Sequence, residues 1–257
     1  MSDTTHDARL TTHVAGGIMT LTLNRPDKKN AIDIRMIGAL KEALRGADLD
    51  AAVRLVALRG AGPDFCAGLD LSELLESADL LPEQNEARAW DLGEIFVMLR
   101  RLPKITVAVV RGRCLAGGCG LATACDLVLA DAGAQFGYPE INRGFVPAMV
   151  MTMLRRLVGE KTAFDLAATG RLIDAAEAAR IGLITRALPS ASFEADAAAQ
   201  LAKLAGFSAS ALALTKQQFY QLDGLPFEDG IRLGAKVNAV SRATPDFKSA
   251  IAQFLKK

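Results

Sequence analysis

The stretch GRCLAGGCGLATACD, residues 112–126, carries the strongest indications of fold and chemistry in this 257-residue chain. It runs from a turn through the Gly117-Gly118 pair into an apolar segment with helical character that ends near Ala124. The first N–H groups of a helix have no partner inside the helix, so glycines there can present bare backbone donors to a ligand oxygen. Glycine serves equally well in a tight turn or a close helix contact, so the sequence leaves both interpretations open here.

The strands predicted on either side of this stretch indicate a parallel sheet. Ile105–Val110 and Leu127–Ala130 are nearly continuous apolar runs, which are typical of strands covered on both faces. Upstream, Ile18–Leu23 alternates with the period of a strand, Val53–Leu58 is a second apolar run, and a helix that begins after Asp33 lies between them. Strands and helices thus alternate over the first half of the chain, which predicts the parallel crossover units of an α/β fold.

After Pro147 the pattern changes to a succession of helical segments. The predicted helices of this part cover 149–157, 160–168, 175–180, 193–205, 209–222 and 227–240, and a short strand is predicted at 183–187. One earlier helix is predicted at 86–101, after a polar segment at 77–86 that we expect to be irregular. Thr244-Pro245 predicts a final helix, because Thr is a good N-cap and Pro fits the first helical position. We expect a β/α core over 1–190, which contains the site, and a helical region over 191–257.

The composition excludes several classes of protein. Hydrophobic residues make up 51% of the chain and the formal net charge is +1, so it lacks the basic surplus with which proteins hold nucleic acid. The N-terminal residues lack the basic-then-apolar layout of a signal peptide, and no apolar run approaches the roughly 20 residues of a membrane span. We therefore expect a cytoplasmic protein that binds neither nucleic acid nor membrane.

The cysteines and histidines give little support to a metal site. The cysteines form no C-x-x-C pair, so we expect free thiols that pack as small buried side chains; they are Cys66, Cys114, Cys119 and Cys125. The two histidines, His6 and His13, both lie near the N-terminus. We expect no bound metal and few ways to build a Ser-His-Asp triad.

Two glycine-containing loops follow predicted strands and could act together. They are Cys66–Asp70 and Ala116–Gly118. If their strands are neighbours, both loops lie at one edge of the sheet and each can offer one N–H group. Two donors that converge on one oxygen form an oxyanion hole, in which each donor contributes about 3–4 kcal/mol to the stability of a transition state. Such a hole suits a carbonyl or thioester that becomes an enolate.

A single glutamate, Glu140, lies downstream of this pair. It follows Pro139 and a short apolar segment, and a carboxylate in an apolar pocket has a raised pKa that suits a general acid or base. An isolated loop glutamate is more often simply solvated. Position 120, one turn after the glycine pair, is Gly, so no second acid stands there.

The order and spacing of these motifs resemble those of the enoyl-CoA hydratase/isomerase (crotonase) superfamily. The matching segments are Asn24-Arg25-Pro26 with Asn30-Ala31, FCAGLDL at 65–71, LAGGCGLATACDLVLA at 115–130, AQFGYPEINRGFVP at 134–147 and TGRLIDAAEAARIGLI at 169–184. The resemblance implies an α/β spiral of repeated ββα units with a helical C-terminal trimerisation region, as a homotrimer or a dimer of trimers. It also implies an acyl-CoA thioester substrate, with no cofactor beyond the coenzyme A that the substrate contains.

The resemblance assigns roles to individual residues. It implies catalytic roles for Glu140 and for the backbone N–H groups of Leu69 and Gly117. It places substrate and coenzyme A against Ala67, Gly68, Asp70, Leu71, Gly118, Lys28 and Lys29. From the residues alone, exposed lysines beside a turn are usually just solvated, and Asp70 is more often the cap of a helix than a substrate contact.

The residue at position 120 leaves the reaction open. Hydratases of the family use two glutamates, of which one matches Glu140 and the other falls at Gly120. Our first hypothesis is hydration of a 2-enoyl-CoA; the alternatives are an enoyl-CoA isomerase with the same single glutamate and a non-catalytic protein that binds CoA esters. Tyr138 could donate a hydrogen bond or pack, and Arg143 could pair with Glu140, pair with a substrate carboxylate or lie at the surface.

Overall fold

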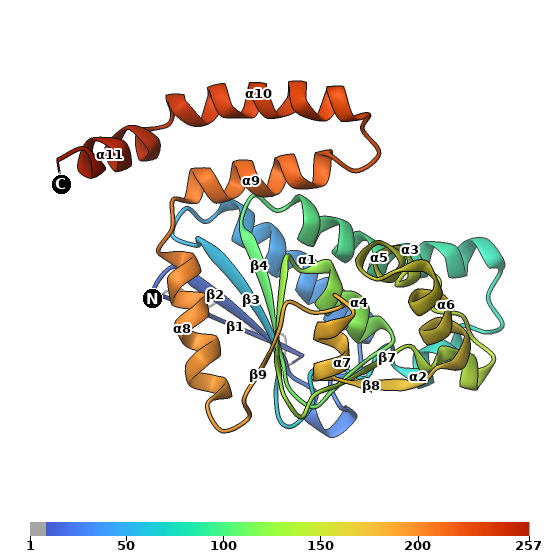
Figure 1. Cartoon of the computed structure of the whole chain (residues 1–257). Helices are drawn as coiled ribbons and strands as arrows, with labels where there is room; N and C mark the ends of the chain where they lie inside the picture. Colours follow the sequence, from blue (N-terminus) through green and yellow to red (C-terminus); the bar gives the residue numbers. More distant parts are fainter. Residues whose placement is uncertain (1–8, 257) are drawn as a thin grey trace.

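The structure is a computed structural model that describes residues 9–256, arranged as two sheets with helices around them (Figure 1). The larger sheet has the order β1-β2-β3-β4-β6-β9, formed by β1 (Leu10–Ala15), β2 (Ile18–Leu23), β3 (Leu55–Gly60), β4 (Ile105–Val110), β6 (Leu127–Asp131) and β9 (Arg186–Leu188). The smaller sheet has the order β5-β7-β8, formed by β5 (Arg113–Leu115), β7 (Gln135–Gly137) and β8 (Leu172–Asp174). From β2 to β9 the larger sheet is parallel, as the apolar runs predict.

The helices cover the sheets and form the C-terminal part of the chain. They are α1 (Ile34–Leu49), α2 (Leu71–Glu76), α3 (Pro82–Arg101), α4 (Gly117–Ala124), α5 (Met151–Leu157), α6 (Glu160–Thr169), α7 (Ala175–Arg180), α8 (Phe193–Ala205), α9 (Ala209–Gln221), α10 (Phe227–Ala243) and α11 (Pro245–Phe254). Two 3-10 helices are η1 (Pro26–Lys28) and η2 (Pro139–Arg143). The predicted caps are confirmed, because the Asp33 carboxylate accepts the Met36 N–H and the Thr244 hydroxyl accepts the Phe247 N–H.

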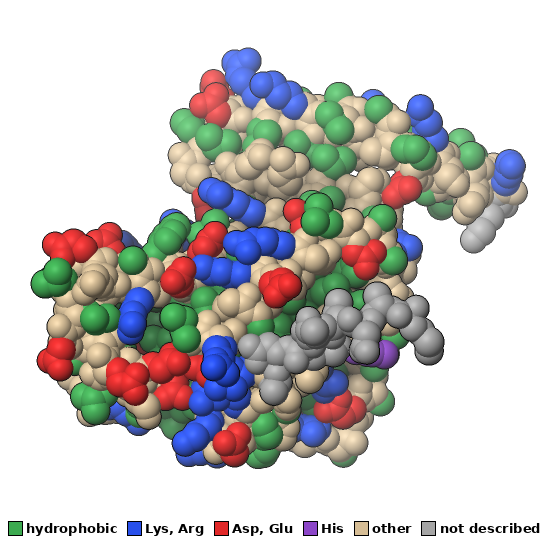
Figure 2. Space-filling view, turned by 180° about the vertical axis from the view of Figure 1, so that it is seen from behind, with side chains coloured by type: hydrophobic (Ala, Val, Ile, Leu, Met, Phe, Trp, Pro, Cys, Tyr) green, Lys and Arg blue, Asp and Glu red, His purple; other side chains and the backbone are tan. Residues whose placement is uncertain are grey.

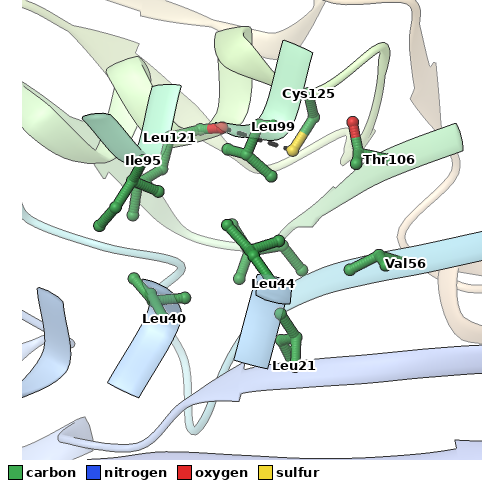
Figure 3. A pocket seen from close by; sticks show the side chains of 10 residues that line it. Leu21, Leu40, Leu44, Val56, Ile95, Leu99, Thr106, Leu121 and Cys125 are labelled. Carbon is green, nitrogen blue, oxygen red and sulfur yellow. Dashed lines mark hydrogen bonds between the residues drawn. The ribbon is translucent and has the colours of Figure 1, made fainter. Parts of the chain in front are cut away.

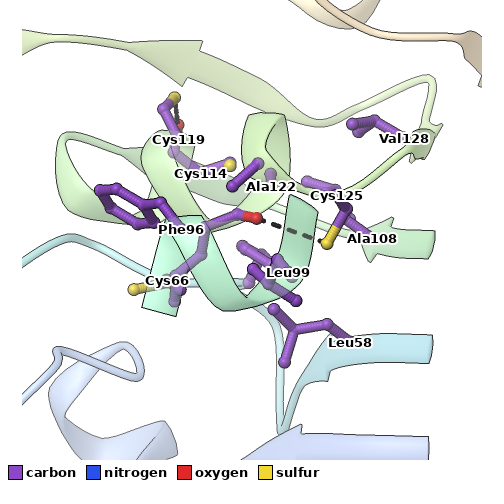
Figure 4. Packing of buried hydrophobic residues seen from close by; sticks show 14 of the residues in the cluster. Leu58, Cys66, Phe96, Leu99, Ala108, Cys114, Cys119, Ala122, Cys125 and Val128 are labelled. Carbon is purple, nitrogen blue, oxygen red and sulfur yellow. Dashed lines mark hydrogen bonds between the residues drawn. The ribbon is translucent and has the colours of Figure 1, made fainter. Parts of the chain in front are cut away.

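The larger sheet separates two apolar cores. Alternate residues of a strand face opposite sides, so Val56 of β3 packs with α1, α3 and α4, whereas Leu55 packs with Phe193 of α8. Figure 4 shows part of the larger core, in which Phe96 of α3 lies near the cysteines. That core contains a cavity of about 10 Å³, and Figure 3 shows side chains that line it. Its lining is apolar except for Thr106 and the Cys125 thiol, so we assign it to core packing rather than to a ligand site.

One expectation for the region before α3 is wrong. Residues 82–86 are helical rather than irregular, because Pro82 fits the first position of α3 and the Gln84 side chain accepts the Leu81 N–H at 3.1 Å. The loop that contains Asp70 leads directly into α2, a short helix whose cap the sequence indicates but whose extent it does not. The strand β1 is likewise unpredicted, since only its first residue, Leu10, is buried and its pattern carries no clear alternation.

The helical C-terminal region divides into two parts. Helix α8 packs on the larger sheet, with Phe193, Ala197 and Leu201 in the smaller core. Helices α10 and α11 extend away from the sheets (Figure 1), and none of their own residues is buried. The proposed division at 190/191 stays a prediction.

Two surface properties concern the expected partners. On the face that Figure 2 shows, acidic and basic side chains are interspersed. Within residues 9–256, no single helix is long and apolar enough to cross a bilayer; α8 and α9, bent by 97°, pass that test only as a pair and only by length and composition.

Candidate functional site

The two glycine-containing loops meet, as the sequence predicts, but the second loop follows β5 of the smaller sheet rather than a strand beside β3. Ile32 forms a β-bridge with Leu69, in which the Ile32 N–H donates to the Gly68 carbonyl and the Asp70 N–H donates to the Ile32 carbonyl, both at 2.8 Å. The hydrogen bonds are formed by Gly68 and Asp70, the residues on either side of Leu69, so the N–H group of Leu69 itself points away from Ile32. A Cβ atom built on Gly68 would lie 3.4 Å from the Gly117 nitrogen, which places the second loop directly against the first.

Both candidate donors are available. Within the described part of the chain, neither the Leu69 N–H nor the Gly117 N–H donates a hydrogen bond. Gly117 is the first residue of α4, where helix N–H groups lack internal partners. The preceding Ala116 has φ +52° and ψ −124°, a strained conformation for a residue with a side chain, and such strain is common at functional sites. The local structure therefore holds a free N–H at the start of α4.

A partly buried polar network holds the first loop and the residues just before it. The Arg25 guanidinium donates to the Ala31 carbonyl and to the Asp70 carboxylate, both at 2.8 Å. The Asn30 amide donates to the backbone carbonyls of Ala61 and Asp64. Arg25 and Asn30 belong to the motif that carries the family resemblance, but the sequence alone assigns neither of them this positioning role.

The Glu140 carboxylate is buried beside these loops. It lies in η2 after β7, and β7 is tied to the second loop because the Ala116 N–H donates to the Gly137 carbonyl at 2.9 Å. The residue is 9% exposed and its Oε2 atom has no hydrogen-bond partner. Desolvation raises the pKa of Glu140, against the opposing effects of its own backbone N–H and of Arg143. A buried carboxyl with a raised pKa can both take and return a proton near neutral pH.

Apolar side chains fill the space beside Gly120. A Cβ atom at this position would lie 2.6 Å from both Phe96 Cζ and Val150 Cγ1, well inside van der Waals contact. Because Phe96 belongs to α3 and Val150 precedes α5, no local sequence signal reveals this packing. A carboxylate at position 120 would therefore need these two side chains to move.

Comparison with known proteins agrees with this arrangement. The family model for enoyl-CoA hydratase/isomerase matches residues 13–257. The chain belongs to the enoyl-CoA hydratase/isomerase family. A Thermus thermophilus protein named "Putative enoyl-CoA hydratase" is 41% identical over 242 residues, which cover 94% of this chain and 96% of that protein.

Two further relatives extend the comparison within the enoyl-CoA hydratase/isomerase family. The 2,3-dehydroadipyl-CoA hydratase of Escherichia coli is 33% identical over 242 residues, which cover 93% of this chain and 92% of that protein. The crystal structure of an enoyl-CoA hydratase from Mycobacterium smegmatis has a TM-score of 0.93 at 31% identity and covers 97% of each chain. The expected crotonase-like α/β fold is therefore confirmed.

The remaining residues expected at the site of this family member fall into two groups. Ala67, Gly68 and Gly118 lie in the two loops, and the Ala67 N–H donates to the Lys29 carbonyl at 3.0 Å. Lys28, Lys29 and Leu71 have exposed side chains at the edge of the first loop.

The side chain of Asp70 is already engaged. Its carboxylate caps α2 by accepting the Ser72 N–H at 3.0 Å and also pairs with Arg25. Desolvation by partial burial raises the pKa of Asp70, but the hydrogen bond from Arg25 and the other contacts outweigh it, so the pKa is lowered overall. The alternative that Asp70 caps a helix is confirmed, and its role toward substrate stays a prediction.

Tyr138 and Arg143 differ in their surroundings. Tyr138 is fully buried, whereas Arg143 is exposed and acts on Glu140 only through its charge. Burial raises the pKa of Tyr138 well above its usual value. The hydroxyl of Tyr138 therefore stays protonated, and the residue is deeper in the fold than its place in a loop suggests.

Within residues 9–256, no group of three or more histidine, cysteine or acidic side chains is placed to hold a metal ion. His6 lies outside the described residues, and His13 is exposed on β1. All four cysteines are free and buried, as the sequence predicts. Burial raises the pKa of the Cys66 thiol to about 12, so this thiol, although it is the first residue of the first loop, is inert at neutral pH.

Proposed function

We propose that this family member is an enoyl-CoA hydratase that adds water to a 2-enoyl-CoA through an enolate. The observation that carries the proposal is the meeting of two unpaired backbone N–H groups, on Leu69 and Gly117, near a buried carboxylate with an unpaired oxygen. The hydratase names of relatives at 33% and 41% identity support the same reaction.

In this proposal the Leu69 and Gly117 N–H groups hold the thioester oxygen. Attack of water at carbon 3 moves electrons onto that oxygen, and the two donors stabilise the negative charge that develops. Donors fixed by the backbone need no reorganisation during the reaction, and each is worth about 2.7–4 kcal/mol. The β-bridge to Ile32 and the strained Ala116 keep both donors in place.

Glu140 then carries the proton. Its carboxylate takes one proton from water while the water oxygen bonds to carbon 3, and it returns that proton to carbon 2 when the enolate collapses. The sum of the steps is addition of one water molecule across the double bond. The raised pKa of Glu140, which burial causes, suits a group that must take and return a proton.

An isomerase is the second candidate, and the surroundings of Gly120 favour it. Phe96 and Val150 leave no room for a second acid there, and a shift of a double bond from carbon 3 to carbon 2 needs only one proton carrier. Turnover of crotonyl-CoA beside turnover of a 3-enoyl-CoA separates the two reactions. Tight acyl-CoA binding without turnover of either compound would support a non-catalytic protein instead.

Coenzyme A binding is proposed along the first loop. The exposed ammonium groups of Lys28 and Lys29 can meet phosphate oxygens as point charges. Ala67 of the first loop and Leu71 at the start of α2 provide small and apolar surface, whereas Gly68 and Gly118 are buried where the two loops meet and let them approach closely. The double variant Lys28→Ala/Lys29→Ala should raise KM for crotonyl-CoA and leave kcat unchanged; an unchanged KM at low salt would refute this contact.

The proposal includes assembly through the C-terminal helices, as a homotrimer or a dimer of trimers. Phe227 of α10 is 83% exposed and Phe254 of α11 is 74% exposed, and none of the residues of these two helices is buried. Large exposed apolar side chains on such helices are typical of subunit contacts. Sedimentation of the wild type and of Phe227→Asp tests this assembly, and a monomeric wild type would contradict it. A cytoplasmic location stays a prediction, which fractionation of cells would test.

A further inference from the structure

Two buried polar atoms in neighbouring residues lack partners. Among residues 9–256, Tyr138 Oη and Glu140 Oε2 are the only buried side-chain nitrogen or oxygen atoms without a hydrogen bond. Leaving such an atom unpaired costs about 1–3 kcal/mol. Both atoms belong to the turn from β7 into η2, which is tied to the second glycine loop through Gly137. Their coincidence indicates a shared ligand.

The side chains of α4 offer that ligand no free hydrogen-bond donor. Gly120 has no side chain, and Phe96 and Val150 occupy the space beside it. The Thr123 hydroxyl donates to the Cys119 carbonyl at 2.6 Å. The Cys119 thiol donates to the Cys114 carbonyl at 2.7 Å, so toward Tyr138 it has only a weakly accepting sulfur left.

We propose that the Tyr138 hydroxyl is the second hydrogen-bond contact of the attacking water, beside Glu140. This inference rests on the proposed hydration reaction. It assigns to Tyr138 the holding role for which position 120 offers no side chain. The other partner of the water is the unpaired Oε2 atom of Glu140.

The protonation state of Tyr138 fits this role. Burial, and after it the neighbouring Cys119, Cys114 and Glu140, raise the pKa of Tyr138, so the phenol stays neutral. A neutral hydroxyl can accept a hydrogen bond from one O–H of water but does not take the proton. The other O–H points to Glu140, which takes the proton. A lone pair of the water oxygen is then free to attack carbon 3.

Tyr138→Phe tests the contact, with Tyr220→Phe as a matched control. These are the two tyrosines of the chain, and the Tyr220 hydroxyl donates to Asp126 at 2.8 Å, away from the site. Removing the Tyr138 hydroxyl should lower kcat for crotonyl-CoA hydration about tenfold, with little change in KM and no loss in the urea midpoint, because that hydroxyl has no partner in the fold. Removing the Tyr220 hydroxyl should lower the urea midpoint and leave kcat unchanged.

Each outcome decides between a water contact and a structural role. If Tyr138→Phe hydrates at the wild-type rate, or loses stability as Tyr220→Phe does, the inference is wrong. Isomerisation of a 3-enoyl-CoA, which adds no water, should be unaffected by Tyr138→Phe, and an equal loss there would also overturn it. Failure of the wild type to hydrate crotonyl-CoA would instead reject the proposed function, so the two failures are distinguishable.

Discussion

Gly118 has almost no space around its Cα, although it is not itself the proposed donor. A Cβ atom there would lie 2.4 Å from the Cys66 carbonyl oxygen and 2.8 Å from Cys66 Cβ. The two loops would have to separate by about 1 Å to restore ordinary contact. The same carbonyl accepts the Leu115 N–H at 2.9 Å, so the separation also strains that hydrogen bond. Gly118→Ala therefore disturbs the spacing between the two proposed donors.

The expected magnitudes follow from this geometry. Overpacking in a filled interior costs about 1–3 kcal/mol and the strained hydrogen bond about 1 kcal/mol, so Gly118→Ala should lower the free energy of unfolding by about 2–4 kcal/mol. Displacing one donor of an oxyanion hole should lower kcat about 10²–10³-fold. Urea unfolding and the rate of crotonyl-CoA hydration measure the two effects.

Gly117→Ala is the matched control. A Cβ atom on Gly117 would lie 3.6 Å from Leu92 Cδ2 and 3.7 Å from Ile32 Cδ1, which are ordinary contacts. The N–H group stays in place, so this variant should unfold within about 0.5 kcal/mol of the wild type. Wild-type stability and rate in Gly118→Ala, or equal destabilisation of both variants, would refute the reasoning.

Three further predictions concern other parts of the fold. Gly120→Ala should lower the free energy of unfolding by about 1–3 kcal/mol, because its Cβ would lie 2.6 Å from both Phe96 and Val150. Urea unfolding measures this change. An unchanged free energy of unfolding would show that these two side chains move aside at no cost. Lys216→Met should cost about 3–5 kcal/mol in thermal or urea unfolding, because it leaves Asp126, 2.7 Å from the buried ammonium, without its ion-pair partner; a loss below about 1 kcal/mol would contradict this. Burial raises the pKa of Glu140, so between the pKa of the unfolded chain and that of the folded protein only the folded protein keeps this proton. Stability therefore falls as the pH rises through this range. Glu140→Gln should then unfold at a higher urea concentration than the wild type at neutral pH. A lower midpoint would mean that the carboxylate stabilises the fold.

Strong local patterns in the sequence predict much of the fold. The ends of β2, β4, α4, α7 and α8 agree with the predicted ranges, because apolar runs and helical spacing reflect burial directly. The three-residue strands of the smaller sheet cannot be found this way, since they exist through pairing with distant residues. Their partners are set by the register, as with Cys114 opposite Phe136.

In the site, too, features of short segments are predictable from the sequence and contacts between distant residues are not. The glycine loops and Glu140 are visible as motifs, because backbone donors and a lone carboxylate depend on short segments. The contact of Phe96 and Val150 with Gly120 joins three elements, and no local pattern encodes it. The unpaired hydroxyl of Tyr138 is likewise a property of the folded chain, because the sequence leaves packing and hydrogen bonding equally open.

The central claim is that Glu140 carries the proton in a hydration reaction, and Glu140→Gln tests it most directly. Crotonyl-CoA is incubated with the wild type, with Glu140→Gln and with Glu160→Gln, whose side chain is 77% exposed. Mass spectrometry then follows the gain of one water. We predict that the wild type and Glu160→Gln form the hydrated product at equal rates, and that Glu140→Gln is slower by about 10²–10⁴-fold with its fold intact. Hydration at the wild-type rate by a folded Glu140→Gln would contradict the account.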